Sequence, residues 1–185
     1  MEFGGLEVGT VSEFSDRFVQ GLASVLRRAS LPRRLRREID LERAMWPLVR
    51  TYTKRVLNLS EEELDEAIVT HGRTREEKER WTRSKLHQNV VVYGHANTSD
   101  IFLTERRVKS VYVEFKLAKV RSRKASTLPG DLQRSVGQSL LAHLRHRHVV
   151  CCIVCQRRVH HDGNAKRLEK ILWNKHRIAL VVRST

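Results

Sequence analysis

The sequence predicts an α/β fold, in which a mixed β-sheet is flanked by helices and preceded by a helical extension. Apolar residues recur at helical spacing in the first part of the chain, and strand-like runs begin at residue 89. Two strand–helix–strand passages then follow, which imply parallel pairing with right-handed crossovers. We therefore expect one domain over residues 35–185, built from a three-strand antiparallel meander and two further strands, and an N-terminal helical extension over residues 1–34.

The N-terminal elements carry the helical pattern. Phe14, Phe18 and Leu22 mark a short amphipathic helix. A second helix is predicted over residues 35–57, with a kink or break at Pro47. Glu42 stands inside the apolar stripe of that helix, which would turn its carboxylate toward the core. Burial of an unpaired carboxylate is costly, so Glu42 requires a partner, either a metal ion or the cation of a structural ion pair.

Two shorter helices are expected before the strands. Ser60 and Glu63 have the spacing of a capping box, which predicts a helix from residue 61 to about residue 69. A charged helix follows over residues 74–87, and opposite charges four positions apart favour a solvent-exposed surface for it.

Three strand-like runs follow at residues 89–93, 100–103 and 110–117, and their short connections predict an antiparallel meander. Side chains alternate along a strand, so Tyr112, Glu114 and Lys116 share one face of the third run. Glu114 and Lys116 are then roughly 7 Å apart. A second carboxylate, Asp100, begins the preceding run and would lie beside Glu114. Two carboxylates and a lysine can hold Mg²⁺ and activate a water against a phosphodiester.

The C-terminal part alternates helices and strands. A helix is predicted from Asp131 to about residue 145, with Gln133 in the middle of its apolar face and Gln138 off to one side. Residues 148–155 form a buried strand that contains all three cysteines. Cys152 and Cys155 would lie on opposite faces of it, which favours core cysteines over a zinc site. A helix at residues 165–175 and a strand at residues 178–182 complete the prediction.

Charge composition indicates a polyanionic partner. The chain has 36 lysines and arginines against 21 acidic residues, a formal net charge of +15. Such charge attracts phosphate backbones whatever their sequence, and DNA is the first candidate. An acidic membrane surface is the competing interpretation, but no apolar run approaches the roughly 20 residues of a membrane span. Two basic groups are candidates for nucleic-acid contact, although each is also compatible with an ordinary solvated surface: Arg33, Arg34, Arg36 and Arg37, and then Lys119, Arg121, Arg123 and Lys124.

The N-terminus and the cysteines bear on the compartment. Residues 1–10 include acidic residues and glycines and have no apolar core of a signal peptide. Three cysteines, two of them adjacent, suit a reducing compartment better than a disulfide framework. We therefore expect an intracellular, cytoplasmic protein.

The predicted element order, with Asp100 and the tripeptide Glu114-Phe115-Lys116, resembles the PD-(D/E)xK, or restriction-endonuclease-like, nuclease superfamily. The resemblance covers residues from about 35 to 185, and Ser99 stands where the signature has its leading proline. The helix that carries Gln133 is similar to the Q-x-x-x-Y helix of RecB-like nucleases, with Gly137 in place of the tyrosine. In other branches a glutamine follows glycine and precedes leucines, as Gln138 does here.

This resemblance implies a site. Asp100 and Glu114 would bind Mg²⁺, or Mn²⁺ as its substitute, the backbone carbonyl of Phe115 would add a ligand, and Lys116 would orient or deprotonate the attacking water. Glu42 matches a helix glutamate that some branches add to the metal site, and Gln133 or Gln138 would hold Lys116 or the water. The implied function is that of a Mg²⁺-dependent DNA endonuclease, either sequence-specific or specific for junctions and branched DNA.

Other interpretations remain open from the sequence. Glu114 and Lys116 are also compatible with a surface ion pair, which contributes little. The same fold and basic surface would suit a nucleic-acid-binding module without catalysis, or a structural subunit that recruits a partner through its N-terminal helices. For a nuclease, cutting both strands with one site per chain favours a homodimer.

Overall fold

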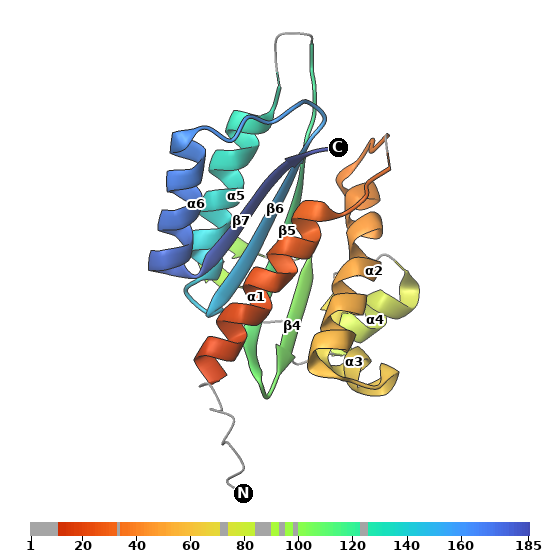
Figure 1. Ribbon diagram of the computed structural model, residues 1–185. Coiled ribbons are helices and arrows are strands. Elements are labelled where there is room, and N and C mark those ends of the chain that lie inside the picture. Colours follow the sequence, from red (N-terminus) through yellow and green to blue (C-terminus); the bar gives the residue numbers. More distant parts are fainter. Residues whose placement is uncertain are drawn as a thin grey trace, which may run out of the picture.

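The protein, described here from a computed structural model, is defined over residues 11–32, 34–70, 74–83, 90–92, 95–97, 100–122 and 126–185. In these residues the chain forms a three-layer α/β fold, with a five-stranded mixed sheet between two layers of helices (Figure 1). The α/β class predicted from the sequence is thus confirmed.

The sheet order is β1 (Ile68–Thr70), β4 (Ile101–Glu105), β5 (Val108–Ala118), β6 (His148–Cys155) and β7 (Ile178–Ser184). The first two junctions are antiparallel and the last two are parallel. This confirms the antiparallel pairing predicted for residues 100–103 and 110–117 and the parallel pairing of the two later strands. Helical crossovers join the parallel strands, also as predicted.

The predicted meander is wrong in its first strand. Residues 90–92 form β2 (Val90–Val92), which pairs with β3 (His95–Asn97) in a separate two-stranded sheet. The edge strand beside β4 is instead β1, at residues predicted to end a helix. Ile68, Val69 and Thr70 are all β-branched and all buried, and such residues fit a pleated, packed surface better than a helix end.

Helices α1 (Val11–Arg28) and α2 (Glu38–Leu57) cover one face of the sheet, and α5 (Leu128–Ala142) and α6 (Gly163–His176) cover the other (Figure 1). The short helices α3 (Glu61–Ala67) and α4 (Arg75–Arg83) contact β1. α2 is continuous through Pro47, so no break occurs there. No helix in the described ranges has the length and apolar character needed to cross a membrane.

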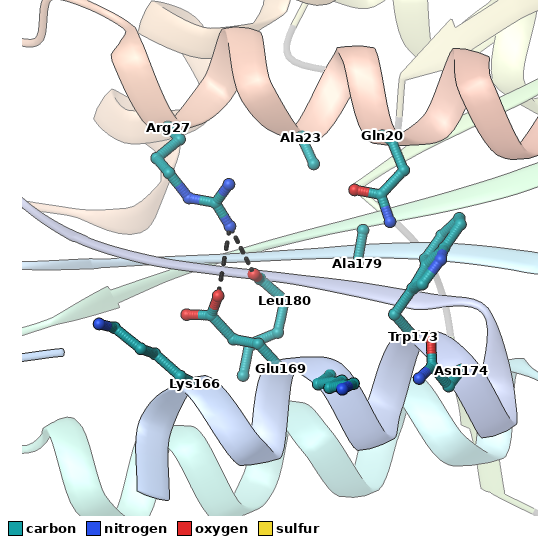
Figure 2. A pocket seen from close by; sticks show the side chains of 10 residues that line it. Gln20, Ala23, Arg27, Lys166, Glu169, Trp173, Asn174, Ala179 and Leu180 are labelled. Atoms are coloured by element: carbon teal, nitrogen blue, oxygen red, sulfur yellow. Dashed lines mark hydrogen bonds and ion pairs between the residues drawn. The ribbon is translucent and has the colours of Figure 1, made fainter. Parts of the chain in front are cut away.

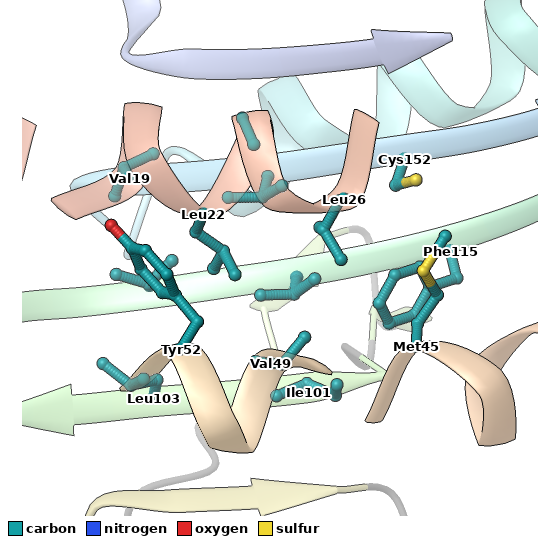
Figure 3. Close-up of a cluster of buried hydrophobic side chains, with 14 of the residues drawn as sticks. Val19, Leu22, Leu26, Met45, Val49, Tyr52, Ile101, Leu103, Phe115 and Cys152 are labelled. Atoms are coloured by element: carbon teal, nitrogen blue, oxygen red, sulfur yellow. The ribbon is translucent and has the colours of Figure 1, made fainter. Parts of the chain in front are cut away.

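Side-chain alternation along β5 separates the two hydrophobic cores. Val113 and Phe115 lie in the larger core, with apolar side chains of α1 and α2 such as Leu22 and Val49 (Figure 3). Tyr112 lies in the smaller core, under α5 and α6. α1 contacts β5, β6 and β7, so residues 11–28 share the larger core with the predicted nuclease-like domain.

The whole of β6 is buried. Cys152 faces the larger core, and Cys151 and Cys155 face the smaller one, so Cys152 and Cys155 lie on opposite faces as predicted. All three are free thiols, and burial raises the pKa values of Cys151 and Cys152 to about 12. Cys151 and Cys152 are therefore uncharged core residues at neutral pH.

The outer edge of β7 lies in a hollow between α1 and α6 (Figure 2). Arg27 of α1 reaches across this edge, where its Nη2 donates to the carbonyl oxygen of Leu180 at 3.3 Å and lies 3.5 Å from Oε2 of Glu169. A charged side chain on an edge carbonyl disfavours pairing with a further strand. We infer that Arg27 and the two flanking helices protect this edge of the sheet from pairing with another strand.

Two helical glycines make a matched test of the packing between α1 and α2. A Cβ at Gly21 would collide with the hydroxyl of Tyr52, which donates to the carbonyl oxygen of Phe18 at 2.9 Å. A Cβ at Gly137 would meet no atom within 4 Å. Gly21→Ala is expected to destabilise the protein by about 1–3 kcal/mol, because overpacking outweighs the gain in helix propensity. Gly137→Ala is expected to stabilise it by up to about 1 kcal/mol.

Urea unfolding monitored by circular dichroism measures both changes. Gly21→Ala combined with Tyr52→Phe should recover part of the loss, because the hydroxyl oxygen is the atom in closest collision. Equal stabilities of the two single variants would contradict the close packing of α1 on α2.

Candidate active site

The candidate site lies where β5 continues past the start of β4. The paired register of these strands ends at Ile101 and Val113, whereas β5 continues to Ala118. Asp100 stands at this step. Its backbone N–H donates to the carbonyl oxygen of Val113 at 3.1 Å, and its Oδ2 accepts the backbone N–H of Phe115 at 2.6 Å. The Asp100 side chain is thereby fixed against the edge of β5.

Glu114 and Lys116 follow on the face of β5 that α5 covers. Glu114 is only 6% exposed, and it lies beside Cys151 in the register with β6. The Tyr112 hydroxyl, two residues earlier on the same face, donates to Oε2 of Glu114 at 3.4 Å. The predicted alternation of Tyr112, Glu114 and Lys116 is therefore correct, and the structure gives Glu114 a buried position in place of a wet sheet face.

The first turns of α2 bring two more carboxylates to the site. Oε1 of Glu38 accepts the ammonium of Lys116 at 2.7 Å. Glu42 lies one helical turn later and is half-buried, and its charge acts on both Asp100 and Glu114. Four carboxylates and one lysine thus form a single electrostatic cluster, contributed by α2, β5 and the residue before β4.

Burial, together with the crowding of these carboxylates, raises the pKa values of Asp100 and Glu114. Burial and the charges of Glu114 and Glu42 hold the pKa of Asp100 well above its ordinary value. Burial raises the pKa of Glu114 to about 7, against the opposing effect of Lys116, and the charge of Glu38 adds to the rise. Two ionised carboxylates that lie close together repel each other unless a positive charge compensates them, and this repulsion favours the binding of a cation.

Lys116 responds in the opposite sense. Burial lowers the pKa of Lys116, but the hydrogen bond and charge of Glu38, together with the charges of Glu114 and Asp100, raise it above its ordinary value. Lys116 is therefore a firmly protonated ammonium in this structure. That state suits charge stabilisation and orientation of a water better than removal of its proton.

Of the two candidate glutamines, Gln133 is exposed, so the inward orientation predicted for it is wrong. The residues of α5 that face the sheet are Ser135, Ser139 and Ala142. The sequence prediction placed the buried face of this helix incorrectly, because two of the buried positions are occupied by small polar residues, Ser135 and Ser139. Gln138 is half-buried beside this line.

Helix geometry places Gln138 on the side of α5 nearest β5. Leu132 lies on the opposite side of the same buried line, where it shares a hollow with Leu168 of α6. α6 contacts β7, and α5 contacts β5 and β6. Gln138 therefore lies on the side of α5 that is away from α6 and toward β5.

Five of the predicted nucleic-acid contacts belong to the described residues and lie in the segments before α2 and after β5. Among the described residues, Arg34, Arg36, Arg37, Lys119 and Arg121 are exposed. Arg33, Arg123 and Lys124, and also Ser99 of the signature, lie outside the described residues.

Glu38 and Tyr112 are the site residues that the sequence prediction omitted. Glu38 and Glu42 are four residues apart on one helix face, where like charges destabilise an isolated helix. That like-charge spacing is a sequence signal for a compensating positive charge nearby, although it does not identify Lys116. Tyr112 was already on the correct strand face, and its role in holding Glu114 required the buried geometry to be seen.

The donor atoms suit a hard divalent cation such as Mg²⁺, which prefers oxygen ligands. The carbonyl of Phe115 points to the same strand edge as its N–H, and thus toward Asp100, because both groups of one residue share an edge. Within the described residues, no three His, Cys, Asp or Glu side chains are arranged to hold a metal ion. A metal site here would therefore combine Asp100, Glu114 and this carbonyl with water or phosphate oxygens.

Comparison with known proteins adds no assignment: no protein-family model matches this chain, and no match is found among characterised proteins or solved structures.

The raised pKa of Glu114 predicts how stability depends on pH in the metal-free protein. A carboxyl whose pKa is higher in the folded state stabilises the fold below its ordinary value of 4.5, and that contribution is lost as the pH rises through about 7. The unfolding free energy should therefore fall between pH 5 and pH 8 by on the order of 3 kcal/mol more than in Glu114→Gln.

Urea unfolding in EDTA at several pH values measures this difference. A wild-type pH profile that parallels that of Glu114→Gln would show that Glu114 is not held in a destabilised charged state.

Proposed function

We propose that this protein is a divalent-metal-dependent DNA nuclease with a restriction-endonuclease-like core of the PD-(D/E)xK type. The observation that carries the proposal is the bond from the Phe115 N–H to the Asp100 carboxylate, which sets Asp100 beside Glu114 and Lys116 at the end of a strand. Separated carboxylates would not support metal-assisted hydrolysis, whereas this cluster has the groups that such chemistry requires.

The order of elements supports the fold assignment. A helix precedes β1, which forms an antiparallel unit with β4 and β5 although α4, β2 and β3 stand between β1 and β4 in the chain. A helix, a strand, a helix and a strand then follow. This is the order on which the resemblance to the PD-(D/E)xK superfamily rests, although β1 supplies a strand of the meander in place of residues 89–93.

In the proposed reaction Asp100 and Glu114 hold the cation, and Glu38 and Glu42 complete the negative environment around it. When bound, Mg²⁺ would polarise the scissile phosphate and lower the pKa of a coordinated water. Lys116, kept protonated by Glu38, stabilises the charge that develops on the phosphate and orients the water. Tyr112 positions Glu114 through its hydroxyl.

DNA is the proposed substrate because of the charge of the protein. The net charge of +15 gives attraction to a phosphate backbone, and exposed arginines and lysines border the site at both the start of α2 and the end of β5. Cleavage of both strands of a duplex by one site per chain would require two chains, so a homodimer belongs to this proposal.

Substitution of the cluster tests the catalytic proposal. Asp100→Ala and Lys116→Ala should each reduce Mg²⁺-dependent cleavage of plasmid, linear or branched DNA by at least about 10²-fold, because Asp100 would hold the cation and Lys116 would stabilise the charge that develops on the phosphate. Affinity for DNA in EDTA should change little. Activity is read on gels with Mg²⁺, Mn²⁺ or EDTA, and circular dichroism confirms that each variant folds.

Glu76→Ala, an exposed carboxylate on α4, is the control and should retain full activity. Full activity of Asp100→Ala or Lys116→Ala would overturn the assignment. Wild-type protein that binds DNA in EDTA and in Mg²⁺ but never cleaves it would instead support a non-catalytic binding module on the same fold.

The two glutamines of α5 give a matched pair. Gln138→Ala should lower the cleavage rate by about 10- to 100-fold, because the half-buried amide lies on the side of α5 nearest the site. Gln133→Ala removes an exposed amide and should leave the rate unchanged. Steady-state cleavage of a labelled duplex measures both, and a larger loss in Gln133→Ala would contradict the orientation of α5.

A further inference from the structure

Gln156, directly after β6, joins three segments that are distant in sequence. Its backbone N–H donates to the carbonyl oxygen of Ala118 at 3.2 Å. Its side-chain Oε1 accepts the N–H of Val120 at 3.3 Å, and its Nε2 donates to the carbonyl oxygen of Leu35 at 2.5 Å. One amide therefore ties the connection between α1 and α2 to the connection that follows β5.

Two arginines reinforce this junction. Nη2 of Arg157 donates to the carbonyl oxygen of Ser122 at 2.7 Å, which adds a second link between the segments after β6 and β5. Nη1 of Arg183, on β7, donates to the carbonyl oxygens of Leu26 at 3.1 Å and Ala29 at 2.5 Å, at the end of α1. The connection between α1 and α2 is thus held near both of its ends.

The joined segments lie at one end of the molecule, the upper end in Figure 1, and six of their arginines and lysines are exposed. We call this surface the basic collar. It consists of Arg34, Arg36, Arg37, Lys119, Arg121 and Arg158, all exposed. Arg37 also lies 3.4 Å from Asp40, whose carboxylate accepts the N–H of Arg37 at 2.9 Å and so fixes the entry into α2.

We propose that the basic collar is one continuous binding surface for the phosphate backbone of duplex DNA, and that Gln156 is the positioning residue that assembles it. This proposal rests on the proposed function, since it assigns the substrate surface of the same site. Arg37 directly precedes Glu38, and Lys119 is three residues, or about 10 Å, beyond Lys116 on the chain. The collar therefore borders the carboxylate cluster on two sides.

Duplex DNA fits this surface better than a single strand. The collar segments Arg34–Arg37, Lys119–Ser122 and Gln156–Arg158 contain no aromatic residue, whereas single-strand binding relies on aromatic side chains that stack on bases. Arginines and lysines on several connections suit phosphates, which position a duplex without reading its sequence. The distance from Lys116 to Lys119 is also well within one helical turn of DNA, about 34 Å.

Because Gln156 is uncharged, replacing it removes hydrogen bonds within the collar and leaves the net charge of the protein the same. Without its side chain the connection before α2 loses its tie to the segment after β5, and Arg34, Arg36 and Arg37 no longer act together with Lys119 and Arg121. Gln156→Met keeps the length of the side chain and removes both of its hydrogen bonds. It therefore tests the assembly of the collar without changing the charge of the protein.

The experiment measures binding of the full chain to a fluorescently labelled duplex of roughly two helical turns, by anisotropy in EDTA at several salt concentrations. Gln156→Met should weaken binding about tenfold near 0.1 M salt and reduce the slope of log K against log salt by about 2, as if two phosphate contacts were lost. Gln133→Met, which replaces another exposed glutamine, is the matched control, and this variant should bind the duplex as the wild-type protein does.

A second comparison couples Gln156 to the arginines. Arg36→Ala should weaken binding about three- to tenfold in the wild-type background and much less in Gln156→Met, because the segment is then already displaced. Arg75→Ala removes an exposed arginine of α4 and should have little effect. Circular dichroism and urea unfolding establish that each variant is folded.

An unchanged salt slope in folded Gln156→Met would overturn the role of Gln156, and additive effects of Gln156→Met and Arg36→Ala would do the same. Tighter binding of a single strand than of the duplex, or equal dependence on these residues for binding to anionic phosphatidylserine vesicles, would overturn the proposed ligand. Because EDTA suppresses cleavage, these outcomes are independent of the catalytic test. A protein that binds through the collar but never cleaves DNA would refute the nuclease proposal alone.

Discussion

The hydrogen bond from the Phe115 N–H to the Asp100 carboxylate is the interaction on which the site depends. β4 begins one residue after Asp100, so the antiparallel ladder stops while β5 continues, and a side-chain oxygen takes the place of the next backbone acceptor. This satisfies a strand N–H that would otherwise lose its partner. It also fixes the half-buried Asp100 carboxylate beside the buried Glu114, where the pKa values of both are raised. The proposed metal site would account for these raised pKa values, because a bound cation would compensate the charge of both carboxylates.

The rest of the fold holds four carboxylates near one another. The larger core packs α1 and α2 on the face of β5 that carries Val113 and Phe115, which keeps Glu38 and Glu42 in place. The smaller core packs α5 and α6 on the opposite face, over Tyr112 and beside Glu114. Lys116 joins the two sides, since it belongs to β5 and binds Glu38 of α2. The cluster is thus built from separate layers, and loss of packing in either core would separate its members.

The sequence predicted the parts of this arrangement that follow from short-range periodicity. Alternation along a strand placed Glu114 and Lys116 on one face, and the change of period placed Asp100 at the start of the preceding strand. It failed where tertiary packing decides. Helical spacing predicts an inward Gln133 because it falls in the middle of the apolar face of its helix, yet the line of α5 that meets the sheet is formed by Ser135, Ser139 and Ala142. Glu38 was missed because its partner, Lys116, is 78 residues away in the chain, a pairing that no local pattern encodes.

The topology also explains why the basic collar and the carboxylate cluster share one end of the protein. β5 and β6 are parallel, so the segments that follow them leave the sheet at the same edge, as in other sheets with parallel strands. Glu114 and Lys116 lie near the carboxyl end of β5, so any charge on those segments is near the cluster. The connection between α1 and α2 is not placed by the sheet in this way, because it joins two helices of the layer that covers the larger core. Its attachment through Gln156 and Arg183 is therefore the part of the surface that the sheet alone does not provide, and it is the part that brings the arginines before Glu38 to the site.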